Sequence, residues 1–462
     1  MRSTDQLRRD ALQIWRAGVA GVDSARLVGE AVVVEGNRLV VGEQTIDLRV
    51  VKRIAVVGAG KAGAGMAAGL LAALGEELVA QKSVTGWLNV PADCVRPSPP
   101  LVLHAARPAG VNEPTEEGAH GAREILKLAA SLSRDDICFA LISGGASALL
   151  PAPVDEISLA DKLAVTRHLS AAGATINELN TVRKQLSRIK GGGLARACGA
   201  GRLIALIISD VLGDPLDIIA SGPTVPDPGT PQQALDILEK FGAREAGISP
   251  RVFDYLRHKP QQAAPPPSRQ VTNIVIGNNA TAVEAAGFEA ERLGYSHAMT
   301  SARASEGAAK DVGRHLAQMA LTMRRDRGPD CLISGGEPVV KLPPASQRGL
   351  GGRNQQLVLA ALESLAPHQC AGMALLSGGT DGEDGPTDAA GAFLDADVLA
   401  AARSQRLDPA DYLRRCDAYH FFDPLGALIK TGPTQTNVGD LRVVVVDRVE
   451  HPSPQGEHQP EA

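Results

Sequence analysis

Three short apolar runs that each end in Ser-Gly-Gly constrain the fold of this chain most strongly. They lie at residues 136–147 (DICFALISGGAS), 330–338 (DCLISGGEP) and 373–382 (MALLSGGTDG). A buried strand followed by a glycine-rich loop is typical of α/β proteins, which bind ligands outside the carboxyl ends of their strands. The three runs resemble one another as internal repeats would, although any buried strand before a tight loop has this pattern. We therefore expect an α/β fold with a site built from these loops.

Strand-like and helix-like segments alternate along the chain. Apolar runs predict strands at 31–34, 38–41, 54–57, 84–90, 135–142, 202–208, 273–276 and 441–446. Apolar residues at helical spacing predict helices at 4–20, 66–74, 159–172, 176–185, 280–293 and 306–323. Such alternation favours an α/β fold with mainly parallel sheets.

The length of 462 residues suggests about two or three domains. Residues 258–270 (HKPQQAAPPPSRQ) have the composition of a linker. This divides the chain into an N-terminal domain at 1–257 and a C-terminal α/β part at 271–447. The polar segment 448–462 is expected to be disordered.

Composition excludes several classes of partner. Apolar residues make up 44% of the chain, aromatic residues 3%, and the net charge is −5, so nothing indicates a nucleic-acid surface. No apolar run approaches the roughly 18 residues of a membrane span, and the N-terminus does not have the pattern of a signal peptide. The six cysteines form no CxxC pair, as is usual for reduced thiols. We expect a cytoplasmic protein that binds neither nucleic acid nor membrane.

Residues 58–63 (GAGKAG) match the GxGxxG pattern between a predicted strand and a predicted helix. A dinucleotide site also needs an acidic residue at the end of the next strand, and none occurs before Asp93. Lys61 inside the loop suits a phosphate better than a redox cofactor. Gly58 and Gly60 are therefore candidates for phosphate contact, although close helix–strand packing would explain them as well.

Other candidates for anion binding follow predicted strands or precede helices. Ser143, Gly144 and Gly145 offer backbone N–H groups at a strand end. Lys190 precedes three glycines, and Asn278 opens a long helix. A solvated basic face would explain the lysine equally well.

The C-terminal block carries a second set of candidates. Gly335, Gly336 and Glu337 end one apolar run, while Arg353 and Asn354 begin an apolar helix after four residues that include three glycines. A helix N-terminus favours anions through its free N–H groups and its dipole.

Carboxylates near these loops are candidate Mg²⁺ ligands or proton acceptors. Asp210 follows the strand at 202–208, and Asp381 and Asp384 lie in the loop after the third Ser-Gly-Gly run. Oxygen-only ligation suits Mg²⁺ shared with a nucleotide. Helix capping and turn formation are the alternative roles for these acids.

Taken together, these residues make the sequence resemble the glycerate 2-kinase family, whose C-terminal half contains the MOFRL domain, here about 330–447. The matching segments are VGAGKA, LISGGASALLPAP, TINELNTVRKQLSRIKGGGLA, ISDVLGDPLDIIASGPTVPD, SGGEPVV, GLGGRNQQ and SGGTDGEDGPTDAAG. The resemblance implies two three-layer α/β/α (Rossmann-like) domains with an interdomain cleft. It also implies phosphorylation of D-glycerate to 2-phosphoglycerate with ATP and Mg²⁺, and active-site roles for Lys61 and Arg353.

In this hypothesis Lys61 holds the phosphate groups and Arg353 binds the glycerate carboxylate or the transferring group. Asp210 or Asp381 binds Mg²⁺, and a carboxylate accepts the proton of the C2 hydroxyl. An NAD(P)H-dependent hydroxypyruvate reductase is the alternative enzyme, because relatives carry that name. A non-catalytic sensor of a sugar acid or nucleotide is a third class of function. The sequence does not decide whether the chain forms a homodimer.

Overall fold

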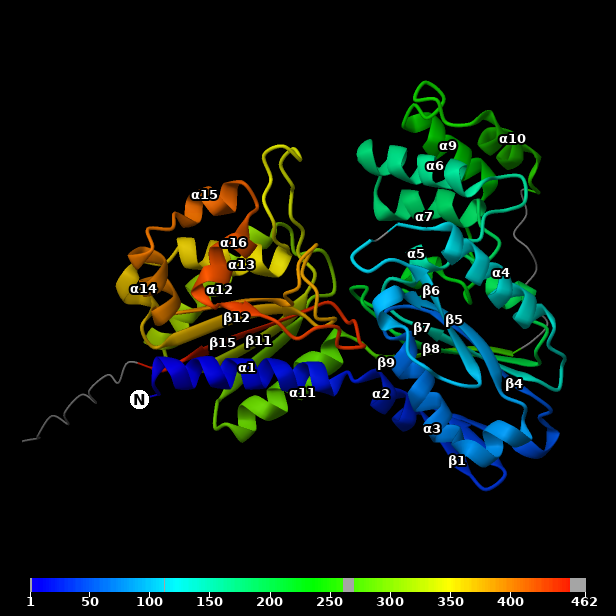
Figure 1. Ribbon diagram of the computed structural model, residues 1–462, viewed down its shortest axis with the longest axis horizontal. Helices are drawn as coiled ribbons and strands as arrows, with labels where there is room; N and C mark the ends of the chain where they lie inside the picture. Colours follow the sequence, from blue (N-terminus) through cyan, green and yellow to red (C-terminus); the bar gives the residue numbers. More distant parts are fainter. Residues whose placement is uncertain (1, 112, 261–269, 449–462) are drawn as a thin grey trace, which may run out of the picture. The chain divides into compact units, whose positions relative to one another are not determined.

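The computed structural model describes residues 2–111, 113–260 and 270–448. The chain forms two compact units, shown in Figure 1. We call Val19–Ala282 together with Thr431–Gly439 the N-terminal unit, and Met1–Gly18, Val283–Lys430 and Asp440–Ala462 the C-terminal unit. Most of the predicted linker and all but the first residue of the predicted disordered tail lie outside the described residues.

These units differ from the predicted domain boundaries for a physical reason. Strand β9 (Gln270–Gly277) pairs with β8 (Arg202–Ile208), so it completes the N-terminal sheet instead of starting the second domain. Helix α1 (Thr4–Gly21) instead belongs mostly to the C-terminal unit, where Trp15 Nε1 donates a hydrogen bond to Gly378 O at 3.3 Å.

The N-terminal unit is built around a six-stranded sheet in which every neighbouring pair is parallel. Its strands are β4 (Ile54–Ala59), β5 (Thr85–Pro91), β6 (Leu101–Arg107), β7 (Ile137–Ile142), β8 and β9, in the spatial order β6-β5-β4-β7-β8-β9. The first strand therefore lies in the middle, and the order reverses between β4 and β7. Doubly wound sheets place their ligand sites at this reversal point.

Helices cover both faces of this sheet, because its strands are buried on both sides. Ile54 and Val56 of β4 pack toward α3 (Gly63–Gln81), whereas Ala55 and Val57 pack toward the opposite helices. Those helices are α4 (Glu116–Ala130), α5 (Ala146–Leu149) and α8 (Gly193–Ala197). Outside α3 lie α2 (Ser24–Ala31) and a small antiparallel sheet of β1 (Val32–Glu35), β2 (Arg38–Val41) and β3 (Gln44–Asp47).

Helix α3 is long and apolar enough, by length and composition, to cross a membrane, contrary to the expectation from the sequence. Its side chains Met66, Leu70 and Leu74 are buried in the core beside the parallel sheet. Among the described helices it is the one that meets this test, and 44% of its most apolar 18-residue window is buried inside the protein.

Four further helices of the N-terminal unit form a lobe with a hydrophobic core of its own (Figure 1). They are α6 (Leu159–Ala171), α7 (Ile176–Gln185), α9 (Pro231–Lys240) and α10 (Pro250–His258). Val165, Val182, Leu238 and Phe253 are buried within this core.

The C-terminal unit has a six-stranded mixed sheet in the order β10-β11-β15-β12-β13-β14. These strands are β10 (His297–Ser301), β11 (Cys331–Gly336), β12 (Met373–Gly379), β13 (Gly391–Asp395), β14 (Leu428–Ile429) and β15 (Asp440–Val446). Only β10 and β11 pair in parallel, and β15 runs antiparallel to both of its neighbours. The α/β fold class is thus confirmed, while the expectation of parallel sheets holds for the first sheet and not for the second.

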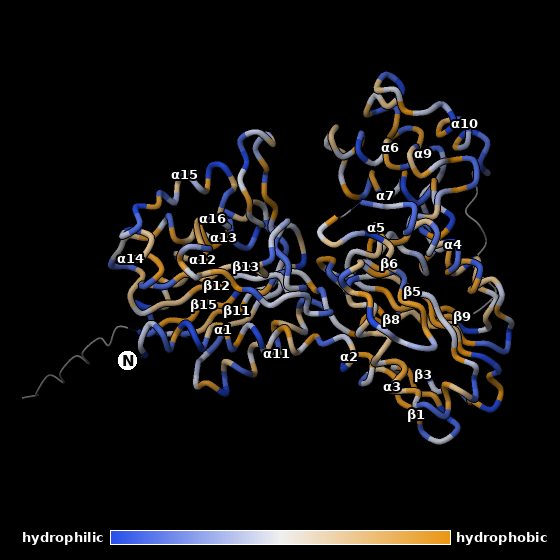
Figure 2. Tube along the Cα trace, in the orientation of Figure 1, coloured by the Kyte–Doolittle hydropathy of each residue, from blue (hydrophilic) through white to orange (hydrophobic). Residues whose placement is uncertain are grey.

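Helices α12 (Ala309–Arg325) and α13 (Arg353–Glu363) lie on one face of this mixed sheet, and α1 lies on the other (Figure 1). The remaining helices are α11 (Asn279–Arg292), α14 (Ala396–Ser404), α15 (Pro409–Arg414) and α16 (Ala418–Phe422). Figure 2 shows that hydrophobic residues concentrate along the strands of both sheets, as cores on both faces of a sheet require.

Candidate active site

The Lys61 loop and the Ser143 loop meet at the reversal point of the N-terminal sheet. The first follows β4 and the second follows β7. Lys61 N donates a hydrogen bond to Gly144 O at 2.9 Å, and Ala62 N donates to Ser143 Oγ at 3.0 Å. Two predicted anion loops, more than eighty residues apart in sequence, therefore form one structure.

Glycine is required in these loops because the backbones approach so closely. A Cβ atom on Gly60, which has φ of +143°, would lie 2.0 Å from Ser143 Oγ. One on Gly58 would lie 2.0 Å from Leu141 O in the neighbouring strand. Gly145 has φ of +81° and lies beside the side chains of Lys61 and Arg107. Gly58 thus serves strand packing, while Gly60 and Gly145 shape the loop around Lys61.

Asp210 joins this cluster from the end of β8. It is partly exposed, and its Oδ2 accepts a hydrogen bond from Asn437 Nδ2 at 2.9 Å. A Cβ atom on Gly144 would lie 2.3 Å from the same carboxylate oxygen. Sequence reasoning missed Asn437, because the segment that carries it enters the N-terminal unit from the far end of the chain.

Lys190 and Asn278 were also predicted as anion-binding residues, and both side chains form hydrogen bonds within the protein. Lys190 is 1% exposed, and its Nζ donates to Ser147 O at 3.0 Å and to Ser147 Oγ at 2.9 Å. Asn278 accepts a hydrogen bond from Thr281 N at the start of α11 and donates from Nδ2 to Asp214 Oδ2 at 2.6 Å. Asn278 is therefore a helix cap as well as a candidate contact.

The end of β5 lacks the acid that a dinucleotide site requires. Asn89 stands near that end, is fully buried, and donates from Nδ2 to Gly118 O and Leu149 O. Asp93 comes later, in a short 3₁₀ turn at Ala92–Cys94. The GAGKAG loop thus has the topology of a dinucleotide fingerprint without its ribose-binding carboxylate.

The second cluster, in the C-terminal unit, is centred on Asp440. This residue begins β15 and lies between Gly336 of β11 and Gly379 of β12 in the sheet register. Asp440 is 0% exposed. The Ser-Gly-Gly runs of β11 and β12 are therefore strand ends that flank a buried carboxylate.

The expected placement of two glycines in this region needs correction. Gly335 and Gly336, expected in a phosphate loop, are paired residues of β11. A side chain would not fit at Gly336, because a Cβ atom there would lie 1.8 Å from Glu306 Oε2. Glu306 in turn accepts two hydrogen bonds from Arg442, at 2.8 and 2.7 Å, so the glycine makes room for a buried ion pair.

Arg353 is the first residue of α13 and is held by two carboxylates. Its Nε and Nη2 donate to the two oxygens of Asp440 at 2.7 and 3.0 Å, and its Nη1 donates to Glu337 Oε1 at 2.8 Å. A guanidinium has five N–H donors. One N–H on Nη1 and one on Nη2 therefore have no partner among residues 2–111, 113–260 and 270–448.

Electrostatics in this cluster follow from burial and these pairs. Burial opposes the charge of Arg353, but Asp440 and Glu337 outweigh it and raise the pKa of the guanidinium. Burial raises the pKa of Glu337, and the nearby charge of Arg353 offsets this only in part. Arg353 is thus a permanent cation, and Glu337 is a carboxylate with increased proton affinity.

Asp384 caps α13, which argues against its predicted role as a metal ligand. Its two oxygens accept hydrogen bonds from Asn354 N at 3.0 Å and Gln355 N at 2.8 Å. It is 2% exposed, and burial raises its pKa to about 7. Asn354 also donates from Nδ2 to Asp440 Oδ1 at 2.9 Å, so this predicted binding residue supports the cluster from behind Arg353.

Asp381 remains near the cluster. It is partly exposed, its Oδ1 accepts a hydrogen bond from Glu383 N at 3.1 Å, and its charge contributes to the raised pKa of Glu337. No three His, Cys, Asp or Glu side chains among the described residues are grouped as a metal site. A Mg²⁺ ion here would therefore need oxygens from a bound nucleotide as well.

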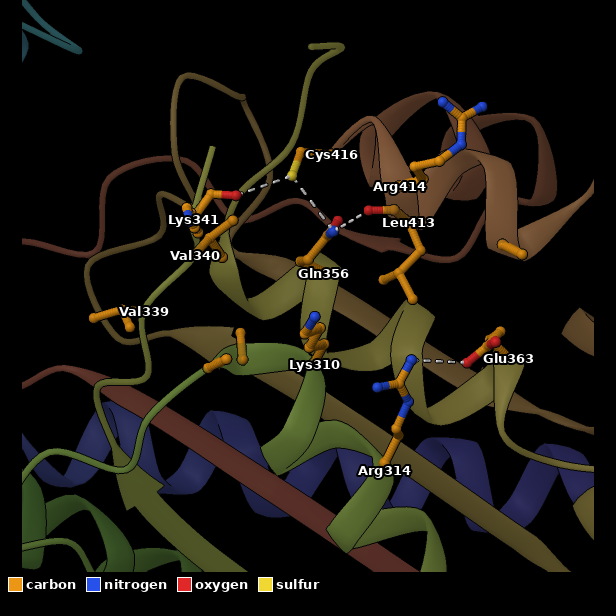
Figure 3. A pocket seen from close by; sticks show the side chains of 13 residues that line it. Lys310, Arg314, Val339, Val340, Lys341, Gln356, Glu363, Leu413, Arg414 and Cys416 are labelled. Atoms are coloured by element: carbon orange, nitrogen blue, oxygen red, sulfur yellow. Dashed lines mark hydrogen bonds and ion pairs between the residues drawn. The ribbon is translucent and has the colours of Figure 1, made fainter. Parts of the chain in front are cut away.

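A separate cavity of about 410 Å³ in the C-terminal unit contains none of the predicted site residues (Figure 3). It is lined by residues of α12 (among them Lys310 and Arg314), α13 and α15, by the segment after β11, and by Cys416, which follows α15. Its lysines are exposed side chains, as on an ordinary protein surface.

Comparisons with known proteins agree with this architecture. Residues 10–257 match a domain of unknown function (DUF4147), and residues 330–440 match the MOFRL family. The glycerate kinase of Mus musculus is 36% identical over 506 aligned residues, covering 96% of this chain and 94% of the mouse protein. A putative hydroxypyruvate reductase of Agrobacterium vitis is 39% identical over 402 residues, covering 85% of this chain and 87% of that protein.

A solved structure gives the same result in three dimensions. The crystal structure of glycerate kinase from Thermotoga maritima matches with a TM-score of 0.79 and 32% identity, covering 96% of this chain and all of that chain. Nearly full-length similarity in both sequence and fold leaves little room for a different family. The chain is therefore an enzyme of the glycerate kinase family, and its C-terminal part carries a MOFRL domain.

Proposed function

We propose that this enzyme transfers the γ-phosphoryl group of ATP to the 2-hydroxyl of D-glycerate, giving 2-phosphoglycerate and ADP. The observation that carries the proposal is Arg353: a fixed guanidinium with two N–H donors left for a ligand. Such a pair of donors binds a carboxylate or a phosphate through two hydrogen bonds, and we propose that here it binds the carboxylate of D-glycerate.

The Lys61 loop suits the phosphate groups. Phosphoryl transfer depends on positioning and on neutralising charge more than on covalent chemistry by the protein. Lys61 supplies a cation, and its loop is held in shape by Ser143 and Gly144. The position of this loop at the reversal point of a parallel sheet further supports a nucleotide ligand.

Glu337 is our candidate for the group that accepts the proton of the substrate hydroxyl. It contacts Arg353, which we propose binds the substrate carboxylate, and burial raises its pKa. A carboxylate with raised pKa is the better proton acceptor near neutral pH. Glu337→Gln should lower kcat more than it changes the KM for D-glycerate. A variant in which kcat and the KM for D-glycerate change by the same factor would contradict this role.

Mg²⁺ would be held here by few protein ligands. Asp210 and Asp381 are partly exposed carboxylates next to the proposed anion contacts, and one or two carboxylates plus phosphate oxygens are the usual ligands of nucleotide-bound Mg²⁺. When bound with the nucleotide, the ion would neutralise phosphate charge. We propose Asp210 or Asp381, as alternatives, for this role and leave out Asp384, whose oxygens cap α13.

A product assay tests the proposal directly. Purified protein would be given D-glycerate and MgATP, with enolase but no phosphoglycerate mutase as the coupling system, so that only 2-phosphoglycerate gives a signal. We expect a signal that requires ATP and is lost on chelation of Mg²⁺. ADP formation without the enolase signal would contradict phosphorylation at the 2-hydroxyl.

A parallel assay distinguishes a kinase from a reductase. The doubly wound strand order is the observation that favours a dinucleotide, and hydroxypyruvate with NADH or NADPH would be run in parallel. We expect no oxidation of either cofactor, because the carboxylate that would hold the ribose is missing. Cofactor oxidation without phosphorylation would refute the kinase proposal.

All six cysteines are free, five of them buried, which supports a reducing compartment such as the cytoplasm.

A further inference from the structure

The helical lobe of the N-terminal unit contains an unusual concentration of buried cations. Lys162 of α6, Arg183 and Lys184 of α7, and Lys190 shortly after α7 form what we call the cation cluster. Lys162, Lys184 and Lys190 are only 5%, 8% and 1% exposed, and Arg183 is partly exposed. Lysine is almost never so deeply buried unless a counter-charge accompanies it.

The cation cluster has little counter-charge among residues 2–111, 113–260 and 270–448. Within these residues only Lys184 has acidic partners, Asp217 at 3.5 Å and Asp227 at 3.4 Å. Lys162 Nζ is inaccessible to solvent and has no hydrogen-bond partner. The guanidinium of Arg183 makes no hydrogen bond or ion pair with any residue in the described part of the chain.

Lys190 connects the cluster to the phosphate loop described above. Its Nζ donates to the backbone and side-chain oxygens of Ser147, at the end of the loop that begins at Ser143. The same loop binds Lys61 N through Gly144 O. The loop at 143–147 therefore contacts both the Lys61 loop and Lys190 of the cation cluster.

The charges of the cluster also act on one another. Burial, and then the charges of Arg183, Lys162 and Lys184, lower the pKa of Lys190 well below its ordinary value. Burial and the charge of Arg183 lower the pKa of Lys162 to about 7. Repulsion among these cations is unfavourable, and a bound polyanion would relieve it.

We propose that the cation cluster binds the phosphate chain of the nucleotide, with Arg183 in contact with the phosphates and Lys162 and Lys190 supplying positive charge behind it. The inference rests on the proposed kinase function for the identity of the nucleotide. A triphosphate carries several negative charges, which matches a cluster of several cations. A single carboxylate, such as that of glycerate, would neutralise only one of them.

Sodium tripolyphosphate provides a probe that does not depend on catalysis. Its binding to the full-length protein would be measured by calorimetry at constant ionic strength, alongside the KM for ATP and for D-glycerate. Arg183→Met should weaken tripolyphosphate binding and raise the KM for ATP on the order of tenfold or more, with an unchanged KM for D-glycerate. Arg188→Gln is the matched control, because Arg188 lies in the same segment but is exposed and pairs with Asp155.

Lys162→Met separates a binding role from a structural one. Removing a buried amino group that has no hydrogen-bond partner should raise the melting temperature of the ligand-free protein while weakening tripolyphosphate binding. A lysine that merely packs in the core would leave binding unchanged. This variant also guards against a misfolded Arg183→Met, since we expect it to be more stable than wild type.

The outcomes distinguish this inference from the kinase proposal. An active kinase in which Arg183→Met and Lys162→Met keep wild-type affinity for ATP and tripolyphosphate would overturn the inference and leave the kinase intact. Absence of tripolyphosphate binding to the wild type would overturn it as well. Tripolyphosphate binding that needs Arg183, in a protein that does not phosphorylate D-glycerate, would support the polyanion site and refute the proposed reaction.

Discussion

Replacing Asp440 by asparagine removes one charge from the C-terminal cluster while keeping the shape of the side chain. One oxygen of Asp440 accepts from Arg353 Nε at 2.7 Å, and the other accepts from Arg353 Nη2 at 3.0 Å and Asn354 Nδ2 at 2.9 Å. An amide can accept at only one of these two positions. At least one N–H donor would therefore face an NH₂ group.

The expected cost follows from burial. Leaving a buried donor unsatisfied costs about 1–3 kcal/mol, and breaking a fully buried ion pair costs about 3–5 kcal/mol. Asp440 is fully buried, but the side chain of Arg353 is 34% exposed and keeps Glu337 as a partner. We therefore expect Asp440→Asn to lower the free energy of unfolding by about 2–3 kcal/mol, between the values for buried and surface pairs.

Urea denaturation of four proteins would test this value: wild type, Asp440→Asn, Arg353→Gln and the double variant. Because the single variant leaves a cation without its buried partner, the double variant should be less destabilised than the sum of the two, by about 1–2 kcal/mol. Glu337→Gln is the comparison, since its side chain is 41% exposed and should cost under about 1 kcal/mol. Additive effects, or a cost for Asp440→Asn no larger than that for Glu337→Gln, would refute the reasoning.

Three further predictions concern the lysine loop, the helix cap and a glycine. Lys61→Ala should reduce kcat on the order of a hundredfold with an unchanged melting temperature, and near-normal turnover would exclude Lys61 from the reaction. Burial raises the pKa of Asp384 to about 7, so the folded protein keeps this proton above pH 4, where the unfolded chain loses it. Its contribution to stability is complete below about pH 4 and is lost as the pH rises through 7, by up to about 1.4 kcal/mol per pH unit. Urea titrations should show this slope as the difference between wild type and Asp384→Asn, and a difference independent of pH would contradict it. Gly60→Ala, whose Cβ would lie 2.0 Å from Ser143 Oγ, should destabilise the protein by roughly 2 kcal/mol or more and abolish turnover. Gly29→Ala, in a helix with nothing within 4 Å, should be neutral or stabilise by up to about 1 kcal/mol in the same thermal melts.

The N-terminal sheet could be predicted well because its strands are buried on both faces. The runs at 54–57, 135–142 and 202–208 correspond closely to β4, β7 and β8, and the helix predicted at 176–185 has the observed bounds of α7. Strand β6 was missed because Leu101–Arg107 mixes polar and apolar residues, as suits a strand at the edge of the sheet. Local pattern is informative where burial is complete and weak at edges.

The meeting of the N-terminal loops could be predicted because it follows the rule for parallel strands. Lys61, Ser143 and Asp210 all follow parallel strands, and the structure brings their loops together. Asp440 was missed because it is the first residue of its strand and not the residue after a strand end. In the mixed sheet β15 is antiparallel to its neighbours, so its beginning lies beside the ends of β11 and β12. Strand direction depends on pairing across the whole unit, which a local pattern does not contain.

The crossing of the chain between its units has a consequence for synthesis. Thr431–Gly439 completes the N-terminal unit and supplies Asn437 to Asp210, and the next residue, Asp440, supplies the carboxylate that holds Arg353. Both clusters can therefore be completed only after residues 431–440 have been synthesised. A nascent chain still inside the ribosome at residue 430 can have most of its core without either finished cluster. Truncated products of translation are therefore expected to be inactive, however well they fold.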